Sequence, residues 1–383
     1  MINTENKPIG LYIHIPFCEK KCNYCNFLTF VNNDEQIEKY VQYLIKEINL
    51  YKGENIHLDT IYIGGGTPSY LDEKYMVQIV DAIKNVFVLE DNIEFTIEMN
   101  PESVEVDKIK TYLQIGINRF SMGVQSFNND VLNIMGRLHN RTSVFKKLAL
   151  MRELGCKNIS IDLMLANPKQ DIEILRQDLA IACKLDIDHI SYYSLILKEQ
   201  TYFDLWYRQG KIDLFDPEEE RKMYHEVVDT LVRNGFDHYE ISSFAKNGLR
   251  GIHNAKYWTL NDFIGLGMGA AGNISRTRFE NVRDFDSYYD LLDKGQKPLL
   301  EIEELSIEDR EKEYLMLNLR MMQGFDIDQM NKKFSIDFEE KYKDILEKNI
   351  GVGILKKEEN RIKFTDYGID NGEVFFHELY GLN

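Results

Sequence analysis

Apolar runs with the length of β-strands alternate with segments of helical period from the start of the chain to about residue 200. The strand-like runs are GLYIHI (10–15), LDTIYIGGG (58–66), NIEFTIEMN (92–100), INRFSMGV (117–124), NISIDLML (158–165) and DHISYYSLIL (188–197). Each of the first five is followed by a helical pattern, such as EQIEKYVQYLIKEINLY (35–51) after the first. Six strands with intervening helices predict an α/β fold built on a parallel sheet.

Polar and glycine residues cluster where the predicted strands end. Cysteines follow the first strand, GGGTP (64–68) follows the second, Glu98 and Asn100 lie near the end of the third, and GVQSF (123–127) ends the fourth. The carboxyl ends of parallel strands meet on one rim of a barrel, which is where such folds carry their sites. The pattern therefore predicts a barrel or part-barrel with its site on that rim.

The chain changes character twice after residue 200. Residues 201–300 carry a helical pattern at 218–235 and then a glycine-rich aromatic stretch at 257–274, which predicts strand and turn. Residues 301–383 predict three helices and two short strands joined by a polar turn, an order that resembles a winged-helix unit. Since no basic run marks this unit, we expect a packing or interaction role rather than DNA binding. The predicted domains are therefore 1–200, 201–300 and 301–383.

The charge balance excludes one class of partner. A net charge of -17 over 383 residues offers no concentrated basic face for phosphates, so no nucleic acid is expected as a partner. Met1 is not followed by an apolar segment, and no run of 18 or more apolar residues occurs, so neither a signal peptide nor a spanning helix is expected. The predicted location is the cytoplasm.

Three of the five cysteines, Cys18, Cys22 and Cys25, fall within eight residues. Disulfides are rare in a reducing compartment, so this group indicates metal binding or redox chemistry. The CxxxCxxC spacing suits three corners of a 4Fe-4S cluster, whose fourth iron stays open to another ligand. A zinc site is the main alternative, and it would need His14 or a residue distant in the sequence as its fourth ligand.

Unconnected buried thiols explain the CxxxCxxC group poorly. The residues between the cysteines include Glu19, Lys20, Lys21 and Asn23, which predict a polar loop rather than a core strand. Cys156 and Cys183 lie far away in the sequence, and we interpret those two as buried structural thiols.

The cysteine motif resembles that of the radical S-adenosylmethionine superfamily, because it directly follows a first strand and has Tyr24 just before its last cysteine. The resemblance implies a partial (β/α)6 barrel, with S-adenosylmethionine chelated by the open iron and cleaved by one electron to a 5′-deoxyadenosyl radical. It also implies that Gly65, Gly66 and Thr67 of GGGTP bring backbone close to the methionine amino group.

A series of polar residues near the ends of successive strands matches the same pattern. In the porphyrin-related branch of the superfamily, the matching positions contact the ribose, the adenine side and the carboxylate of S-adenosylmethionine. Tyr12, on the first strand, matches a further contact. The series consists of Glu98, Gln125, Arg137 and Asp162.

The runs GLYIHIPFC, GGGTPSYL, NRFSMGVQSF and YEISSFA narrow the resemblance to the oxygen-independent coproporphyrinogen III oxidase family and its sister branch, the HemW-type haem chaperones. The oxidase branch carries a fourth cysteine two residues after the third and a long N-terminal extension. Here Phe27 stands at that position, and only 17 residues precede Cys18. The run ANPKQD (166–171) departs from the Gly-Leu-Pro-Gln-Thr-like run of the family.

The run HNAKYW (253–258) matches the HNxxYW motif of the chaperone branch. The match implies that His253 supplies an axial imidazole to haem iron, while Tyr257 and Trp258 offer aromatic surface. The glycines of FIGLGMGAAGNI (263–274) resemble the same branch.

Two functions follow from the resemblance. The first is a haem chaperone that holds a 4Fe-4S cluster and S-adenosylmethionine, receives electrons from a donor, and passes haem to acceptor proteins such as respiratory cytochromes. The alternative is an oxygen-independent coproporphyrinogen III oxidase, which decarboxylates porphyrinogen propionates by radical chemistry. A purely structural metal protein would leave the series from Glu98 to Asp162 unexplained.

Overall fold

The computed structural model describes residues 7–381 and contains one large sheet of 12 strands, in the order β12-β11-β10-β9-β1-β2-β3-β4-β5-β6-β8-β7. Strands β1 to β6 pair in sequence order, and every one of these pairings is parallel. The predicted α/β fold with a parallel sheet is therefore confirmed. The six strands are β1 (Ile9–Ile15), β2 (His57–Gly65), β3 (Val88–Met99), β4 (Arg119–Gln125), β5 (Asn158–Leu165) and β6 (His189–Ser194).

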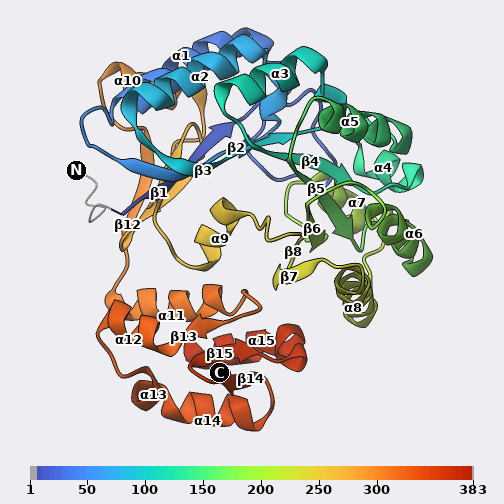
Figure 1. Cartoon of the computed structure of the whole chain (residues 1–383), viewed down its shortest axis with the longest axis vertical. Coiled ribbons are helices and arrows are strands. Elements are labelled where there is room, and N and C mark those ends of the chain that lie inside the picture. The colour runs from blue at the N-terminus through green and yellow to red at the C-terminus, as the bar shows by residue number, and fades with distance from the viewer. Residues whose placement is uncertain (1–6, 382–383) are drawn as a thin grey trace.

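Helices between these strands cover the outer face of the curved sheet (Figure 1). The first helix places Ile37, Tyr40, Val41, Leu44 and Ile48 on one buried face, the spacing that an amphipathic helix needs to pack on a sheet. All residues of β4 are buried, because helices cover one side and the barrel interior the other. The helices are α1 (Asp34–Asn49), η1 (Pro68–Tyr70), α2 (Glu73–Val86), η2 (Pro101–Ser103), α3 (Val106–Ile115), α4 (Asn129–Met135), α5 (Arg141–Glu153) and α6 (Ile172–Ala182).

The segment after β6 extends the sheet at both edges. Strand β8 joins β6 in antiparallel fashion, while β9 joins β1 in parallel and leads into an antiparallel ladder. One sheet thus takes its strands from both sides of residue 200, and the division at 200 stays a prediction. These elements are α7 (Tyr202–Arg208), α8 (Pro217–Arg233), β7 (Asp237–Glu240), β8 (Ser243–Ala245), α9 (Ile252–Trp258), β9 (Phe263–Leu266), β10 (Ala271–Ile274), β11 (Thr277–Asn281), α10 (Phe285–Asp293) and β12 (Leu299–Glu304).

The expectation of strand and turn for 257–274 is wrong at its start, because Tyr257 and Trp258 end helix α9. The helix begins where the backbone N–H groups of Ile252 and His253 donate to the Glu94 carboxylate of β3, at 2.9 and 2.8 Å. This carboxylate satisfies two free donors of the first helical turn, and it lies 158 residues away in the sequence. Local sequence therefore gave no sign of this helix start.

The C-terminal unit has its own core and a three-stranded sheet in the order β13-β15-β14. It lies below the large sheet in Figure 1, and α9 lies between the two. No helix in the described range 7–381 is long and apolar enough to span a membrane. The elements of this unit are α11 (Ile307–Asn318), β13 (Phe325–Asp326), α12 (Ile327–Phe334), α13 (Phe338–Lys341), α14 (Lys343–Gly351), β14 (Leu355–Glu358), β15 (Arg361–Phe364) and α15 (Asp366–Leu379).

Candidate functional site

The cysteine motif lies on the loop between β1 and α1, at the carboxyl end of β1. The loop is tied to its surroundings by backbone hydrogen bonds: the N–H of Cys18 donates to the carbonyl of Phe30 at 3.0 Å, and the N–H of Asn23 donates to that of Met135 at 2.9 Å. All three cysteines of the motif are half-buried free thiols. The fold therefore presents three sulfurs from one anchored loop at the rim of the parallel strands.

A continuous chain of polar contacts joins two of these cysteines across three strand ends. The Cys18 sulfur lies 3.3 Å from Thr67 Oγ1, which accepts a hydrogen bond of 2.9 Å from the Asn100 amide. Arg137 donates to Asn100 Oδ1 at 2.6 Å and to the Cys22 sulfur at 3.3 Å. Asn100 thus connects GGGTP to the arginine, although the sequence gave it no role beyond its place after a strand.

Arg137 is held as a half-buried cation beside the cysteine loop. Its guanidinium also donates to the carbonyl of Gly123 at 2.6 Å, while its Nε is buried without a hydrogen-bond partner. Burial opposes the charge, but the neighbouring Tyr24, Cys22 and Glu102 raise the pKa of Arg137. The site therefore keeps one positive charge with an unused donor, a combination suited to a ligand carboxylate.

The glycines of GGGTP bring the end of β2 against the cysteine loop. The N–H groups of Gly66 and Thr67 donate to the carbonyls of Ile15 and Phe17, at 2.9 and 2.8 Å. A Cβ on Gly66 would lie 2.7 Å from the Phe17 carbonyl oxygen, which is too close for any side chain. Gly65 has a φ of 114°, in the left-handed region that glycine adopts readily.

Glu98 lies near the end of β3, and Tyr12 lies in the middle of β1. Glu98 accepts hydrogen bonds from the Tyr62 hydroxyl at 2.7 Å and from the N–H of Gly65 at 3.0 Å. Burial raises the pKa of Glu98 to about 7. The Tyr12 hydroxyl lies 2.9 Å from Nδ1 of His14, and its ring stacks on Tyr62.

Asp162 and Gln125 complete the series. Burial raises the pKa of Asp162 to about 6, although the Ser121 hydroxyl donates to it at 3.3 Å. Gln125 ends β4 with a φ of 68°, and its buried Oε1 has no hydrogen-bond partner. Strained backbone and an orphaned acceptor at the same residue are typical of a ligand-binding position.

Tyr193 of β6 lies among these residues and was missed by the sequence analysis. Burial raises the pKa of Tyr193. The neighbouring Asp162, Tyr24 and Glu98 raise this pKa further, and the Arg137 guanidinium lowers it. Its alternation with buried Tyr192 along β6 was the available signal for an inward-facing side chain.

The donor set of the rim suits the group that the motif implies. Three thiols of one loop match three corners of a four-iron cube, and Gln125 and Arg137 offer unused polar atoms beside it. In the described residues, no three His, Cys, Asp or Glu side chains converge on a point as ligands of a single metal ion would. A cube takes its thiolates at separate corners, so its ligands need not converge in this way.

The HNAKYW motif lies on α9, where His253 and Lys256 are buried and the other four residues are half-buried. His253 is fully buried, with Nδ1 2.9 Å from Thr60 Oγ1 and Nε2 2.9 Å from the Tyr257 hydroxyl. Burial, followed by the Lys256 charge, lowers the pKa of His253 to about 3. Both ring nitrogens of His253 are hydrogen-bonded. To bind iron, the imidazole would first have to give up its hydrogen bond with Thr60 or with Tyr257. The Trp258 ring lies under the guanidinium of Arg320, 4.4 Å from the ring centroid.

Comparisons with known proteins agree with this geometry. Residues 12–180 match the model of the Radical SAM superfamily, and residues 305–370 match the HemN C-terminal domain. The chain is 33% identical to the Heme chaperone HemW of Lactococcus lactis and 34% identical to that of Bacillus subtilis, with 97% of each chain covered. It is 34% identical to the Heme chaperone HemW of Escherichia coli over 70% of this chain and 71% of that protein.

A solved structure supports the fold independently. The coproporphyrinogen III oxidase (HemN) of Escherichia coli, described as a radical SAM enzyme, superimposes with a TM-score of 0.84 at 23% identity. The match covers 97% of this chain and 90% of that chain. At this identity the likeness concerns the fold, including the attached C-terminal unit.

Proposed function

Because the chain belongs to the HemW family of radical S-adenosylmethionine proteins, we propose that it is a haem chaperone that binds haem and passes it to acceptor proteins. The observation that carries the proposal is the similarity to relatives named Heme chaperone HemW over 97% of both chains. Phe27 supports the same choice, since its exposed ring stands where the oxidase branch has a fourth cysteine.

The proposed cofactors are a 4Fe-4S cluster and S-adenosylmethionine. Cys18, Cys22 and Cys25 would hold the cluster, which when bound supplies one electron for cleavage of S-adenosylmethionine. The other rim residues would hold S-adenosylmethionine itself. They are Tyr12, Tyr24, Gly65, Gly66, Thr67, Glu98, Gln125, Arg137 and Asp162.

The protein groups of the rim have distinct tasks in this proposal. Arg137 would neutralise the carboxylate of S-adenosylmethionine through its unused Nε, while Asn100 and Gly123 fix its guanidinium. Glu98 accepts from Gly65, which holds the backbone of GGGTP in place for the methionine group. Glu98 and Asp162 are half-buried, and desolvation raises the pKa of both carboxyl groups, so hydrogen bonds to ribose hydroxyls would be stronger there than in open water.

The HNAKYW motif takes part in haem handling in this proposal as one wall of the cargo region. Tyr257 lines a smaller cavity of about 360 Å³ beside β10 and β11. Thr259 and Leu260, which directly follow Trp258, line a much larger one. The assignment of His253 as an iron ligand stays a prediction. Binding to iron would require His253 to lose its hydrogen bond with Thr60 or with Tyr257.

The proposed setting is the cytoplasm, where an acceptor protein and an electron donor would meet the chain. All five cysteines are free thiols, as a cluster-binding protein in a reducing compartment requires. Respiratory cytochromes are the proposed class of acceptor.

The test is an anaerobic reconstitution of the cluster followed by two assays on the same sample. Haem titration followed by absorbance is expected to show stoichiometric binding. Incubation with coproporphyrinogen III, S-adenosylmethionine and a reductant is expected to give no decarboxylated product. Porphyrinogen turnover without haem binding would overturn the chaperone function in favour of the oxidase.

A further inference from the structure

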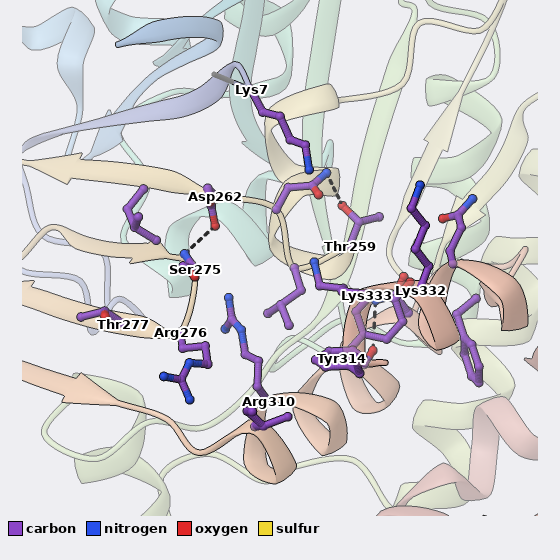
Figure 2. Close-up of a pocket in the computed structure, with 18 of the residues that line it drawn as sticks. Lys7, Thr259, Asp262, Ser275, Arg276, Thr277, Arg310, Tyr314, Lys332 and Lys333 are labelled. Atoms are coloured by element: carbon purple, nitrogen blue, oxygen red, sulfur yellow. Dashed lines mark hydrogen bonds between the residues drawn. The ribbon is translucent and has the colours of Figure 1, made fainter. Parts of the chain in front are cut away.

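A wide hollow lies between the β9–β12 ladder and helices α11 and α12 of the C-terminal unit. It has a volume of about 1510 Å³. Sites for drug-sized ligands occupy roughly 300–1,000 Å³, so this cavity has room for a tetrapyrrole. Figure 2 shows side chains from both units facing the same space.

The cavity is basic although the chain as a whole carries a net charge of -17. Lys7, Arg310 and Lys333 reach into it from three different segments (Figure 2). Lys332 also lines it, and Lys332 and Lys333 have no ion pair within the described part of the chain. Lysines without an ion pair in such a cavity, here Lys332 and Lys333, mark a site for an anion.

Two of these cations act on each other. Arg310 is buried and paired with Glu313 at 2.7 Å, so its position is fixed. Although much of the Lys333 side chain is accessible, desolvation lowers its pKa, and the nearby Arg310 charge lowers it further. An anionic ligand between the two would relieve this repulsion.

The carboxylates of the cavity do not neutralise it. Asp262 accepts a hydrogen bond of 2.8 Å from the N–H of Ser275, and Asp326 caps α12 by accepting from the N–H of Gln329 at 3.0 Å. Asp326 also lies 3.7 Å from Arg361, another cation of the lining, and Asp262 offsets part of the repulsion on Lys333. Neither carboxylate forms an ion pair with Lys332 or Lys333, so these two lysines remain available to an anion.

Part of the remaining wall is apolar. Leu260, Phe279, Ile302 and Phe334 line the cavity, and 62% of Ile302 is exposed to solvent. An exposed isoleucine beside a phenylalanine on a sheet offers a flat surface whose burial against a ring is favourable. Flat apolar walls combined with free cations fit an amphipathic ligand that is planar and carries carboxylates.

We propose that this cavity is the cargo site and that it recognises haem through its two propionates, with Arg310, Lys332 and Lys333 as the cationic contacts. The inference rests on the proposed chaperone function and names the site of its cargo. None of the described side chains that line the cavity is a His, Cys or Met. The cationic and apolar lining therefore addresses the porphyrin carboxylates and ring.

The test compares protoporphyrin IX, which lacks iron, with its dimethyl ester, which also lacks the two negative charges. Each is titrated into the full chain, and binding is followed by porphyrin fluorescence. The free acid is expected to bind at least about tenfold more tightly than the ester, as one or two charge-assisted hydrogen bonds would give.

Variants at exposed positions sharpen the test. Lys332→Glu and Lys333→Glu are each expected to weaken binding of protoporphyrin IX and of haem by about tenfold or more. Lys343→Glu is the matched control, because Lys343 is exposed on α14 and does not line the cavity. Equal melting temperatures of the three variants will show that folding is intact.

The outcomes separate the two proposals. If haem binds but the ester binds as well as the acid, or the two variants bind like the control, the cavity is not the cargo site while the chaperone function stands. If neither haem nor protoporphyrin IX binds to any form of the chain, the chaperone function fails and the cavity assignment fails with it.

Discussion

The imidazole of His253 stacks on the ring of Tyr62, with 5.3 Å between the ring centroids and 28° between the ring planes. The hydroxyl of the same tyrosine donates to Glu98 Oε1 at 2.7 Å. One side chain of β2 therefore contacts both the HNAKYW motif and a carboxylate proposed to bind S-adenosylmethionine. A substitution in HNAKYW should therefore disturb the surroundings of Glu98, and a substitution at Glu98 should disturb those of His253.

Replacement of His253 by alanine is expected to lower the free energy of unfolding by about 2–4 kcal/mol, because it leaves a cavity and removes the partners of Thr60 and Tyr257. If the cargo cavity alone holds haem, the haem affinity of the folded protein should change less than threefold, since His253 does not line that cavity. Urea unfolding and haem titration on the same variant measure both quantities. A stable variant that has lost haem would instead identify His253 as an iron ligand.

Replacement of Cys22 by alanine is expected to abolish the cluster, because the chain offers only three thiols on this loop. Iron bound after anaerobic reconstitution should fall from about four per chain to less than about one, with loss of the brown absorbance. Cys156→Ser is the control, since Cys156 lies in the core away from the loop. A brown Cys22→Ala protein would contradict the ligand assignment.

Asn100 is expected to be a positioning residue for the S-adenosylmethionine site. Asn100→Ala removes the contacts to Thr67 and Arg137, and we expect affinity for S-adenosylmethionine to fall about tenfold while the iron content is retained. Equilibrium dialysis and iron analysis give the two readouts. Asn234→Ala, at the exposed end of α8, should leave both unchanged.

Gly66 is expected to tolerate no side chain. In Gly66→Ala the new Cβ would lie 2.7 Å from the Phe17 carbonyl oxygen, so the cysteine loop must shift and the reconstituted iron content should fall. Gly351→Ala is the control, because a Cβ there meets nothing within 4 Å. Equal iron contents in the two variants would show that the loop does not depend on this close approach.

Glu47 is expected to make the protein less stable as the pH rises. Burial raises the pKa of Glu47 from its usual 4.5 to about 7. Between these two pH values the folded chain keeps a proton on Glu47 that the unfolded chain has released. Stability should therefore fall by about 3 kcal/mol between pH 4.5 and pH 7 from this group alone.

Urea unfolding at pH 5 and pH 8 tests the role of Glu47. In Glu47→Gln this part of the pH dependence should be absent. The variant should also be less stable, because its NH2 group must face a donor in either orientation: the Asn281 amide on one side, or Gly267 N–H and the Tyr288 hydroxyl on the other. Glu38→Gln, on the exposed face of the same helix, should keep the slope of the unaltered chain. The same slope in both variants would show that Glu47 does not carry the effect.

The sequence by itself determined the parallel sheet, the rim position of the site and the cysteine motif. Each depends on local pattern: the alternation of apolar runs with helical periods, the place of CxxxCxxC after β1, and GGGTP after β2. Such signals are readable because they span a few residues and because parallel strands always bring their carboxyl ends to one rim.

Only the tertiary structure decided how distant segments meet. Glu94 caps α9 from 158 residues away, and Asn100 joins Thr67 to Arg137. The burial of His253 and the cationic cavity between the ladder and the C-terminal unit likewise arise from packing of remote elements. Side-chain type fixes what a residue can bond to, but burial and the partners within reach depend on contacts far apart in the chain, which no local pattern records.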